Sequence, residues 1–218
     1  MTDSGTGAGE WRGDGGGTAV TTVRVYLPST MSGIRRALAS GTVPVAGGYG
    51  FAVTAPLRLE YPDWSEEDLE YVAMQDASRA SVRLLAAVQD EGGDGHRDGG
   101  GREPAGGESA RLDRVGGEPL LRVVVAADVS GAAVRPRPEL DRAVVSVAGA
   151  VEWSQVAAVH IDGADAGPAV REAVAVIDAA DLGDDDAEFV LGSVEDFDLA
   201  WYAPGEVVYL LEELDAPG

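Results

Sequence analysis

The alternation of hydrophobic and polar positions along the chain predicts several β-strands. In TTVRVYLP, residues 21–28, every second residue from Val23 to Leu27 is aliphatic. Side chains of a strand point alternately to its two faces, so this period of two predicts a strand. The run LLRVVVAADV, residues 120–129, is apolar at consecutive positions, as in a strand at the centre of a sheet. Further strands are predicted at 51–54, 142–149, 155–161 and 198–202.

A spacing of three to four residues between apolar positions predicts the helices. It is clearest between residues 63 and 89, where Asp63 or Ser65 is the expected N-cap and acidic residues fill the first turn. The apolar face of this helix is expected to contain Leu69, Val72, Ala73, Ala77, Ala80, Leu84 and Val88. Other helices are predicted over 29–40, with Ser29 or Thr30 as N-cap, and over 167–181, 185–197 and 205–214.

The order of these elements predicts the fold class. Strands and helices follow one another as β-α-β-α, then an insertion, then β-β-β-α-α-β-α. This order indicates an α/β fold of α+β-like character, with a mixed β-sheet and helices packed mainly on one face. The connection from strand 155–161 to strand 198–202 is compatible with a right-handed crossover. We expect a single domain over residues 21–214.

Two segments have a composition that disfavours folding. Residues 1–20 contain many glycines, and residues 90–118 are dominated by glycine and charged side chains. Such segments bury too little apolar surface to offset the entropy lost on ordering the backbone. We therefore expect a disordered N-terminal tail over 1–20 and a long disordered insertion over 90–118. Loop-closure entropy grows only with the logarithm of length, so the insertion is expected to change stability little.

Charge narrows the classes of partner. The chain has 38 acidic and 16 basic residues, a formal net charge of -22. Nucleic acids and anionic membranes are bound through Lys and Arg, so we expect neither as a partner. The sequence shows no signal peptide and no run of about 20 apolar residues. We expect a soluble cytoplasmic protein whose partner is another protein, a second copy in a homodimer, or a small molecule of unknown identity.

Residue types that are absent exclude several chemistries. All 16 basic residues are arginines, and the chain contains no lysine and no cysteine. A phosphate-loop lysine, a lysine Schiff base, a thiol nucleophile and a thiolate metal site are therefore excluded. No G-x-S-x-G motif is present. The sequence predicts no cofactor-binding motif and leaves the cofactor unknown.

One short stretch, AVHIDGADAG at 158–167, brings together groups that can do chemistry. His160, Asp162 and Asp165 follow an apolar strand, at the kind of strand end where α/β proteins bind ligands. A histidine with two carboxylates can bind a metal ion or work as a general base. The alternative is structural: DGADAG is turn chemistry that ends a strand and begins a helix. His96, the other histidine, lies in the predicted insertion.

A second acidic cluster, DLGDDDAEF at 181–189, gives candidate metal ligands. Carboxylates of Asp184, Asp185 and Asp186 are suited to Ca²⁺ or Mg²⁺. Their spacing does not match an EF-hand loop. Acidic residues in the first turn of a helix explain the same pattern through the helix dipole.

Several segments together resemble one protein family. They are VRVYLPST, EDLEYVAMQDASRASVRLL, RVVVAADV, DRAVVSVAG, VAAVHIDGADAGPAVREAV and DLAWY, between Val23 and Tyr202. The chain resembles a family of uncharacterised actinobacterial proteins with a domain of unknown function, and departs from it in the glycine-rich N-terminus and the 90–118 insertion. The resemblance implies no reaction and no site residues. We expect a binding or regulatory module without catalytic activity. The alternative is a metal-assisted or general-base enzyme centred on His160, Asp162 and Asp165.

Overall fold

The computed structural model describes most of the chain. The described residues are 21–93, 114–115 and 118–215. The predicted disordered tail lies outside the described residues, as does most of the predicted insertion. The long helix α3 (Glu66–Gly93) continues past residue 90, where the insertion was predicted to begin, and ends at Gly93. Strand β4 (Arg114–Val115) pairs with strand β5 (Glu118–Pro119).

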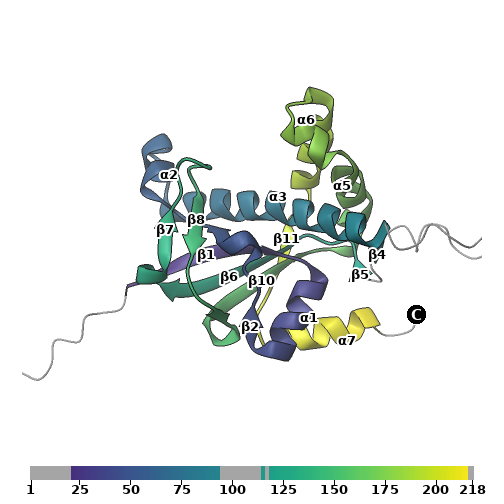
Figure 1. The fold of residues 1–218 in the computed structure, drawn as a ribbon, viewed down its shortest axis with the longest axis horizontal. Helices are drawn as coiled ribbons and strands as arrows, with labels where there is room; N and C mark the ends of the chain where they lie inside the picture. The colour runs from purple at the N-terminus through teal and green to yellow at the C-terminus, as the bar shows by residue number, and fades with distance from the viewer. Residues whose placement is uncertain (1–20, 94–113, 116–117, 216–218) are drawn as a thin grey trace, which may run out of the picture.

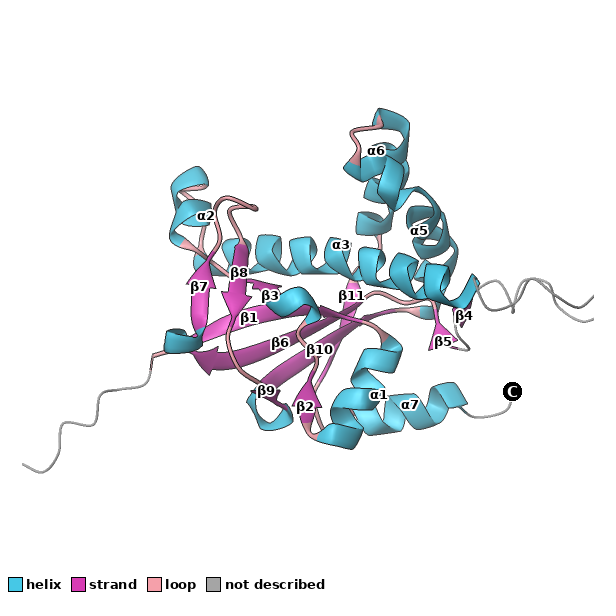
Figure 2. Ribbon diagram, in the orientation of Figure 1, coloured by secondary structure: helices cyan, strands magenta, loops and turns pink. Residues whose placement is uncertain are grey.

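A seven-stranded sheet forms the centre of the fold (Figures 1 and 2). Each pair of neighbouring strands in it is antiparallel. A separate two-stranded sheet joins β2 (Thr42–Val43) to β9 (Val151–Glu152). The order across the main sheet is β11 (Leu199–Tyr202), β10 (Val156–Asp162), β6 (Val123–Ser130), β1 (Thr22–Ser29), β3 (Tyr49–Phe51), β8 (Val144–Val147) and β7 (Val134–Pro136).

The central strands β1 and β6 pair along their whole length, from Thr22 opposite Ser130 to Ser29 opposite Val123. Strand β10 pairs with β6 on one side and with β11 on the other. Because β10 and β11 are antiparallel, the connection between them is not the crossover that the sequence allowed. The helices of this connection pack against the second half of α3, and the chain then returns along β10 in the opposite direction.

Helix ends follow the expected capping rules. Thr30 is the N-cap of α1 (Met31–Ser40), where its hydroxyl accepts a hydrogen bond from the Gly33 amide at 3.1 Å. Gly41 ends this helix in the left-handed region, with φ of 75°, where glycine carries no penalty. The remaining helices are α2 (Ala55–Glu60), α5 (Gly167–Asp181), α6 (Asp185–Gly192) and α7 (Val207–Asp215), with 3-10 turns η1 (Ala46–Gly48), η2 (Gly131–Ala133), η3 (Trp153–Gln155), η4 (Ala164–Ala166) and η5 (Ser193–Asp196).

Helices lie against both faces of the sheet, and the two faces have separate cores (Figure 1). Residues Val25 and Leu27 of β1 face α1 and α7, whereas Tyr26 faces α3. This alternation is the period of two that the sequence shows in β1. A third core joins the second half of α3 to α5 and α6. The α/β, α+β-like class is confirmed. The main sheet is antiparallel where a mixed sheet was expected, and helices cover both of its faces where they were expected mainly on one.

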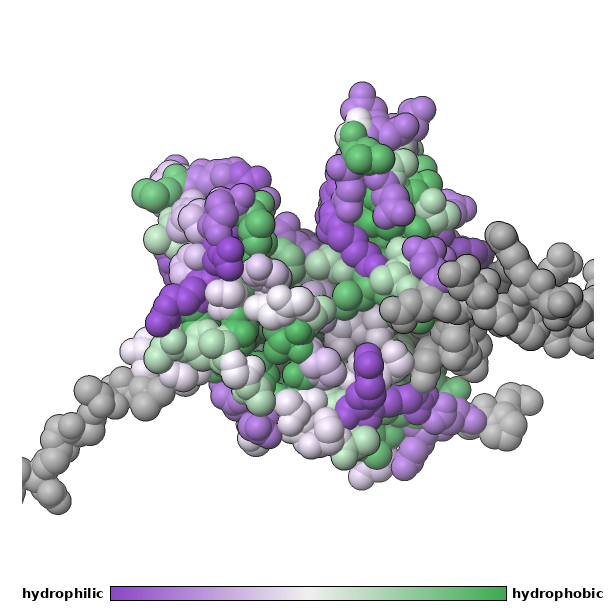
Figure 3. Space-filling view, in the orientation of Figure 1, coloured by the Kyte–Doolittle hydropathy of each residue, from purple (hydrophilic) through white to green (hydrophobic). Residues whose placement is uncertain are grey.

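Figure 3 shows how the surface follows these layers. Hydrophilic side chains predominate over α2 and α6, although Leu59 of α2 and Phe189 of α6 are exposed hydrophobic residues. Hydrophobic side chains also appear in the middle of the same face, between α3 and the layer of α1 and α7. Within the described residues, the helices are each too short or too polar to cross a membrane.

Candidate functional site

Asp162 is part of a buried ion pair. Its carboxylate accepts hydrogen bonds from the Arg122 backbone amide at 2.7 Å and from Arg122 Nη2 at 2.7 Å. Arg122 Nε is 3.1 Å from Oδ1 and 3.0 Å from Oδ2. The two side chains are 2% and 0% exposed. Both carboxylate oxygens are therefore engaged within the fold, which ties the end of β10 to the residue that precedes β6.

The same arginine reaches a third segment. Arg122 Nη2 also donates to the carbonyl oxygen of Phe197 at 2.7 Å, just before β11. Charge-assisted hydrogen bonds of this kind are stronger than neutral ones. The Arg122–Asp162 pair thus fixes β6, β10 and the approach to β11 relative to one another.

His160 lies two residues before Asp162 on β10, on the sheet face that α3 covers. It is half-buried, and burial lowers the pKa of its imidazole, with a further lowering from the positive charge of Arg24. A pKa below the ordinary value keeps the ring neutral at neutral pH. The nearest carboxylate in sequence, that of Asp162, is engaged by Arg122.

Asp165 is exposed in η4. No three His, Cys, Asp or Glu side chains among the described residues are placed to hold one metal ion. The structure thus gives no support to the enzyme centred on His160, Asp162 and Asp165. It fits the structural interpretation of AVHIDGADAG, in which a strand ends, a turn follows and a helix begins.

The acidic cluster at 184–186 has a structural role at its first residue. Asp184 is the N-cap of α6, and its Oδ1 accepts a hydrogen bond from the Ala187 amide at 2.9 Å. Asp185 and Asp186 are exposed in the first turn of the helix. The arrangement is that of a capped helix start with favourable charges near its positive end.

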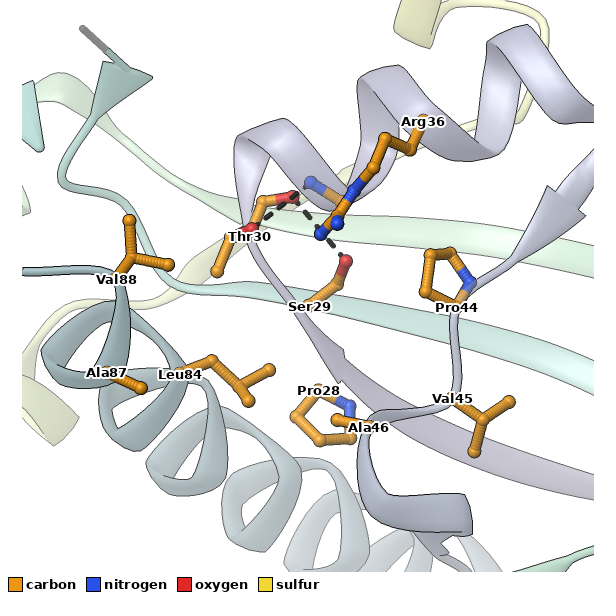
Figure 4. A pocket seen from close by; sticks show the side chains of 11 residues that line it. Pro28, Ser29, Thr30, Arg36, Pro44, Val45, Ala46, Leu84, Ala87 and Val88 are labelled. Carbon is orange, nitrogen blue, oxygen red and sulfur yellow. Dashed lines mark hydrogen bonds between the residues drawn. The ribbon is translucent and has the colours of Figure 1, made fainter. Parts of the chain in front are cut away.

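A cavity of about 230 Å³ opens between α1, α3 and the segment that leads into η1. We call it the α1–α3 cavity. Its lining consists of Pro28, Ser29, Thr30, Gly33, Arg36, Pro44, Val45, Ala46, Leu84, Ala87 and Val88. Figure 4 shows the three α3 residues on one side, Pro44 and Val45 on the opposite side, and Arg36, Thr30 and Ser29 together along a third. The cavity therefore has a mainly apolar wall and one polar corner.

The polar corner is built by the junction of β1 and α1. Ser29 is the last residue of β1, Thr30 caps α1, and Gly33 and Arg36 follow on the helix. A side chain at Gly33 would place its Cβ 2.6 Å from Ser29 Oγ, which is too close for any real contact. Glycine at this position is what allows the Ser29 hydroxyl to lie against the first turn of α1.

The wall formed by α3 is held in place by a buried serine. Ser81 Oγ donates to the carbonyl oxygen of Ser29 at 2.7 Å and accepts from the Val123 amide at 3.0 Å. Ser81 is 0% exposed. These two hydrogen bonds fix α3 to the ends of both central strands. The distance between the α3 wall and the polar corner is thereby set by the sheet.

Arg36 is the charged residue of the cavity lining, and it has no ion-pair or hydrogen-bonding partner for its guanidinium among the described residues. Its neighbour Arg35 forms a bidentate pair with Asp215 at 2.9 and 2.7 Å. Sequence reasoning passed over both residues. Adjacent arginines in SGIRRAL give no signal that one is paired through a contact 180 residues away while the other faces a cavity.

Comparisons with known proteins give a family without a known activity. No curated protein and no solved structure matches the chain. A family model covers residues 23–211, which span both central strands, the α1–α3 cavity and the Arg122–Asp162 pair. The chain belongs to the family of unknown function DUF6912.

Proposed function

We propose that this protein is a binding module that takes a small molecule in the α1–α3 cavity. The observation that carries the proposal is the cavity itself, which combines an apolar wall, a buried hydroxyl and an arginine in one space of about 230 Å³. Ligand sites in proteins have this composition: mainly apolar linings with a few polar groups that orient the ligand.

The volume limits the size of the ligand. Cavities for drug-sized molecules measure about 300–1,000 Å³, and an apolar cavity of about 150 Å³ accepts benzene. At about 230 Å³, the α1–α3 cavity fits a single ring or a short chain with a small polar group. We therefore expect a compact metabolite, with no space for a nucleotide or a peptide inside the cavity.

The position of the cavity also supports binding. Three of its walls are β1, α1 and α3, which are joined by Ser81 and by the cores on either side of the sheet, and the segment that leads into η1 closes the remaining side. A site on rigid elements is largely formed before the ligand arrives, so little binding energy is spent on ordering it. The candidate residues His160, Asp162 and Asp165 of the alternative hypothesis lie outside this lining.

A cavity-filling variant tests the proposal. Ala87 is exposed on α3 and lines the cavity, so Ala87→Trp is expected to fill the space without disturbing any of the three cores. Gln89→Trp is the matched control, because Gln89 is exposed on the same helix and does not line the cavity. Binding of neutral and charged single-ring fragments is measured by ligand-observed NMR.

We expect fragments that bind the wild type to bind Gln89→Trp equally and to lose binding to Ala87→Trp. Equal binding to all three proteins would overturn the proposal, since the fragments would then bind elsewhere. Failure of every fragment to bind the wild type at millimolar concentration would overturn it as well.

A further inference from the structure

From the charge of its lining, we infer that the α1–α3 cavity recognises an organic anion: a small molecule with an apolar body and a single oxyanion head group that binds Arg36. This inference rests on the proposed function and adds the chemical class of the ligand. It concerns the polar corner formed by Ser29, Thr30 and Arg36.

The first observation is the charge of the lining. The chain has 38 acidic and 16 basic residues, yet the cavity lining contains one arginine and no carboxylate. In a chain of net charge -22, the surroundings of an exposed guanidinium would usually supply an acidic partner. A cavity without acidic residues favours a negatively charged ligand over a neutral or a cationic one.

The second observation is that other arginines of the chain have ion-pair or hydrogen-bond partners within the fold. The described residues include eight arginines that form ion pairs with Asp or Glu: Arg24, Arg35, Arg58, Arg79, Arg83, Arg122, Arg137 and Arg142. Arg135 donates to two backbone carbonyl oxygens instead. Arg36 has no such contact within the described part of the chain, and its planar guanidinium is suited to bidentate binding of a carboxylate or phosphate.

The third observation is a buried hydroxyl in the same cavity lining as this arginine. Ser29 is 5% exposed, and its Oγ lies 3.4 Å from the Thr30 carbonyl oxygen. That contact is longer than the distance of about 2.7–2.8 Å usual for an O–H···O hydrogen bond. The Ser29 hydroxyl can therefore donate to an oxyanion in the cavity, whereas Thr30 Oγ1 already accepts from Gly33 at 3.1 Å.

The rest of the lining defines the body of the ligand. Pro28, Pro44, Val45 and Ala46 face Leu84, Ala87 and Val88 across the cavity (Figure 4). A fully polar anion such as inorganic phosphate would leave this apolar wall without contacts. An aromatic or short aliphatic acid satisfies both parts of the cavity, with the head group at Arg36 and the hydrocarbon against α3.

The experiment compares benzoate, phenyl phosphate, benzamide and inorganic phosphate as probes, with dissociation constants from titration by NMR at neutral pH. Benzoate and benzamide have the same ring and differ in charge, whereas benzoate and phenyl phosphate differ in the type of oxyanion. The proteins are wild type, Arg36→Gln, Arg36→Lys and Arg135→Gln. The last variant removes one positive charge outside the cavity.

We expect wild type and Arg135→Gln to bind benzoate or phenyl phosphate at least about tenfold more tightly than benzamide. Whichever anion binds more tightly identifies the head group as carboxylate or phosphate. Arg36→Gln should weaken the binding of that anion about tenfold or more and leave the affinity for benzamide unchanged. Arg36→Lys should fall between them, because lysine keeps the charge and loses the bidentate geometry.

Other results separate the two proposals. Equal binding of benzoate and benzamide to wild type, with no effect of Arg36→Gln, would overturn the anion inference while the cavity remains a binding site. If inorganic phosphate bound as tightly as phenyl phosphate, the inference that the ligand has an apolar body would be overturned. Binding of all probes that persists in Ala87→Trp would overturn the proposed function itself.

Discussion

Asp162 accepts hydrogen bonds from Arg122 through both carboxylate oxygens, and the two side chains are almost completely buried. Removing one member of such a pair leaves the other charge buried without a partner. We expect Asp162→Ala to lower the free energy of unfolding by about 3–5 kcal/mol, measured by urea denaturation. The Arg24–Asp128 pair is the control: its side chains are 37% and 42% exposed, and Asp128→Ala should cost less than about 1 kcal/mol. Similar losses for the two variants would contradict the role given to burial.

Two serines one turn apart on α3 should respond to substitution in opposite ways. Ser81 Oγ bonds to Ser29 and Val123, so Ser81→Ala leaves a buried carbonyl and a buried amide without this partner. The expected loss in the free energy of unfolding is about 1–3 kcal/mol. Ser78 is equally buried, but its Oγ has no hydrogen-bond partner within the described residues. Ser78→Ala should therefore be neutral or stabilising in urea denaturation. Equal losses of unfolding free energy in Ser78→Ala and Ser81→Ala would contradict the role given to the Ser81 hydrogen bonds.

Asp76 is expected to make stability depend on pH. Burial is the main cause that raises the pKa of its carboxyl to about 6, with Asp141 adding to the rise and Arg142 and Arg79 opposing it. Its unfolded pKa is about 3.9, so the folded state binds more protons between these values. Stability contributed by this group is therefore present below about pH 4 and is lost as the pH rises through about 6.

Replacing Asp76 by Asn removes this dependence. We expect Asp76→Asn to be more stable than the wild type at pH 7, by about 1–2 kcal/mol after allowance for solvent screening of a partly exposed group. The difference should close toward pH 4. Asp178→Asn, at an exposed position of α5, serves as the control in urea denaturation across this pH range. A constant difference between wild type and Asp76→Asn at all pH values would contradict the raised pKa.

His160 should titrate below the ordinary histidine pKa of 6.5, because burial and the nearby Arg24 charge disfavour its protonated form. A lowered pKa in the folded state means that stability from this group is present above pH 6.5 and is lost as the pH falls through the folded pKa. An NMR titration of the imidazole in a His96→Gln background leaves a single histidine signal. An ordinary or raised pKa in that titration would show that the ring is better solvated than its position on β10 indicates.

Periodicity predicted the long helix and the two central strands because their patterns are local. It misplaced part of the apolar face of α3: Leu84 and Val88 are half-buried and line the cavity, whereas Ser78 and Ser81 are in the core. The reason is that α3 crosses from the sheet onto α5 and α6, so the buried side of the helix changes along its length.

Other features depend on contacts that sequence spacing does not contain. Strand β3 ends at Phe51, where a strand was expected to begin, because the chain turns into α2, which Thr54 caps three residues later. His160 and Asp162 were candidate site residues because the chain has no lysine, no cysteine and only two histidines. Arg122, which forms the buried ion pair with Asp162, is 40 positions away in sequence.

The end of α3 lies beside β4, so the chain leaves the described fold after Gly93 and re-enters it at Arg114 at nearly the same place (Figure 1). Whatever joins these two points does not have to span the sheet, and its length is free to vary without moving a core strand. This makes the junction a suitable attachment point for a fluorescent reporter: a folded domain can be spliced in there while both ends of the seven-stranded sheet stay where they are.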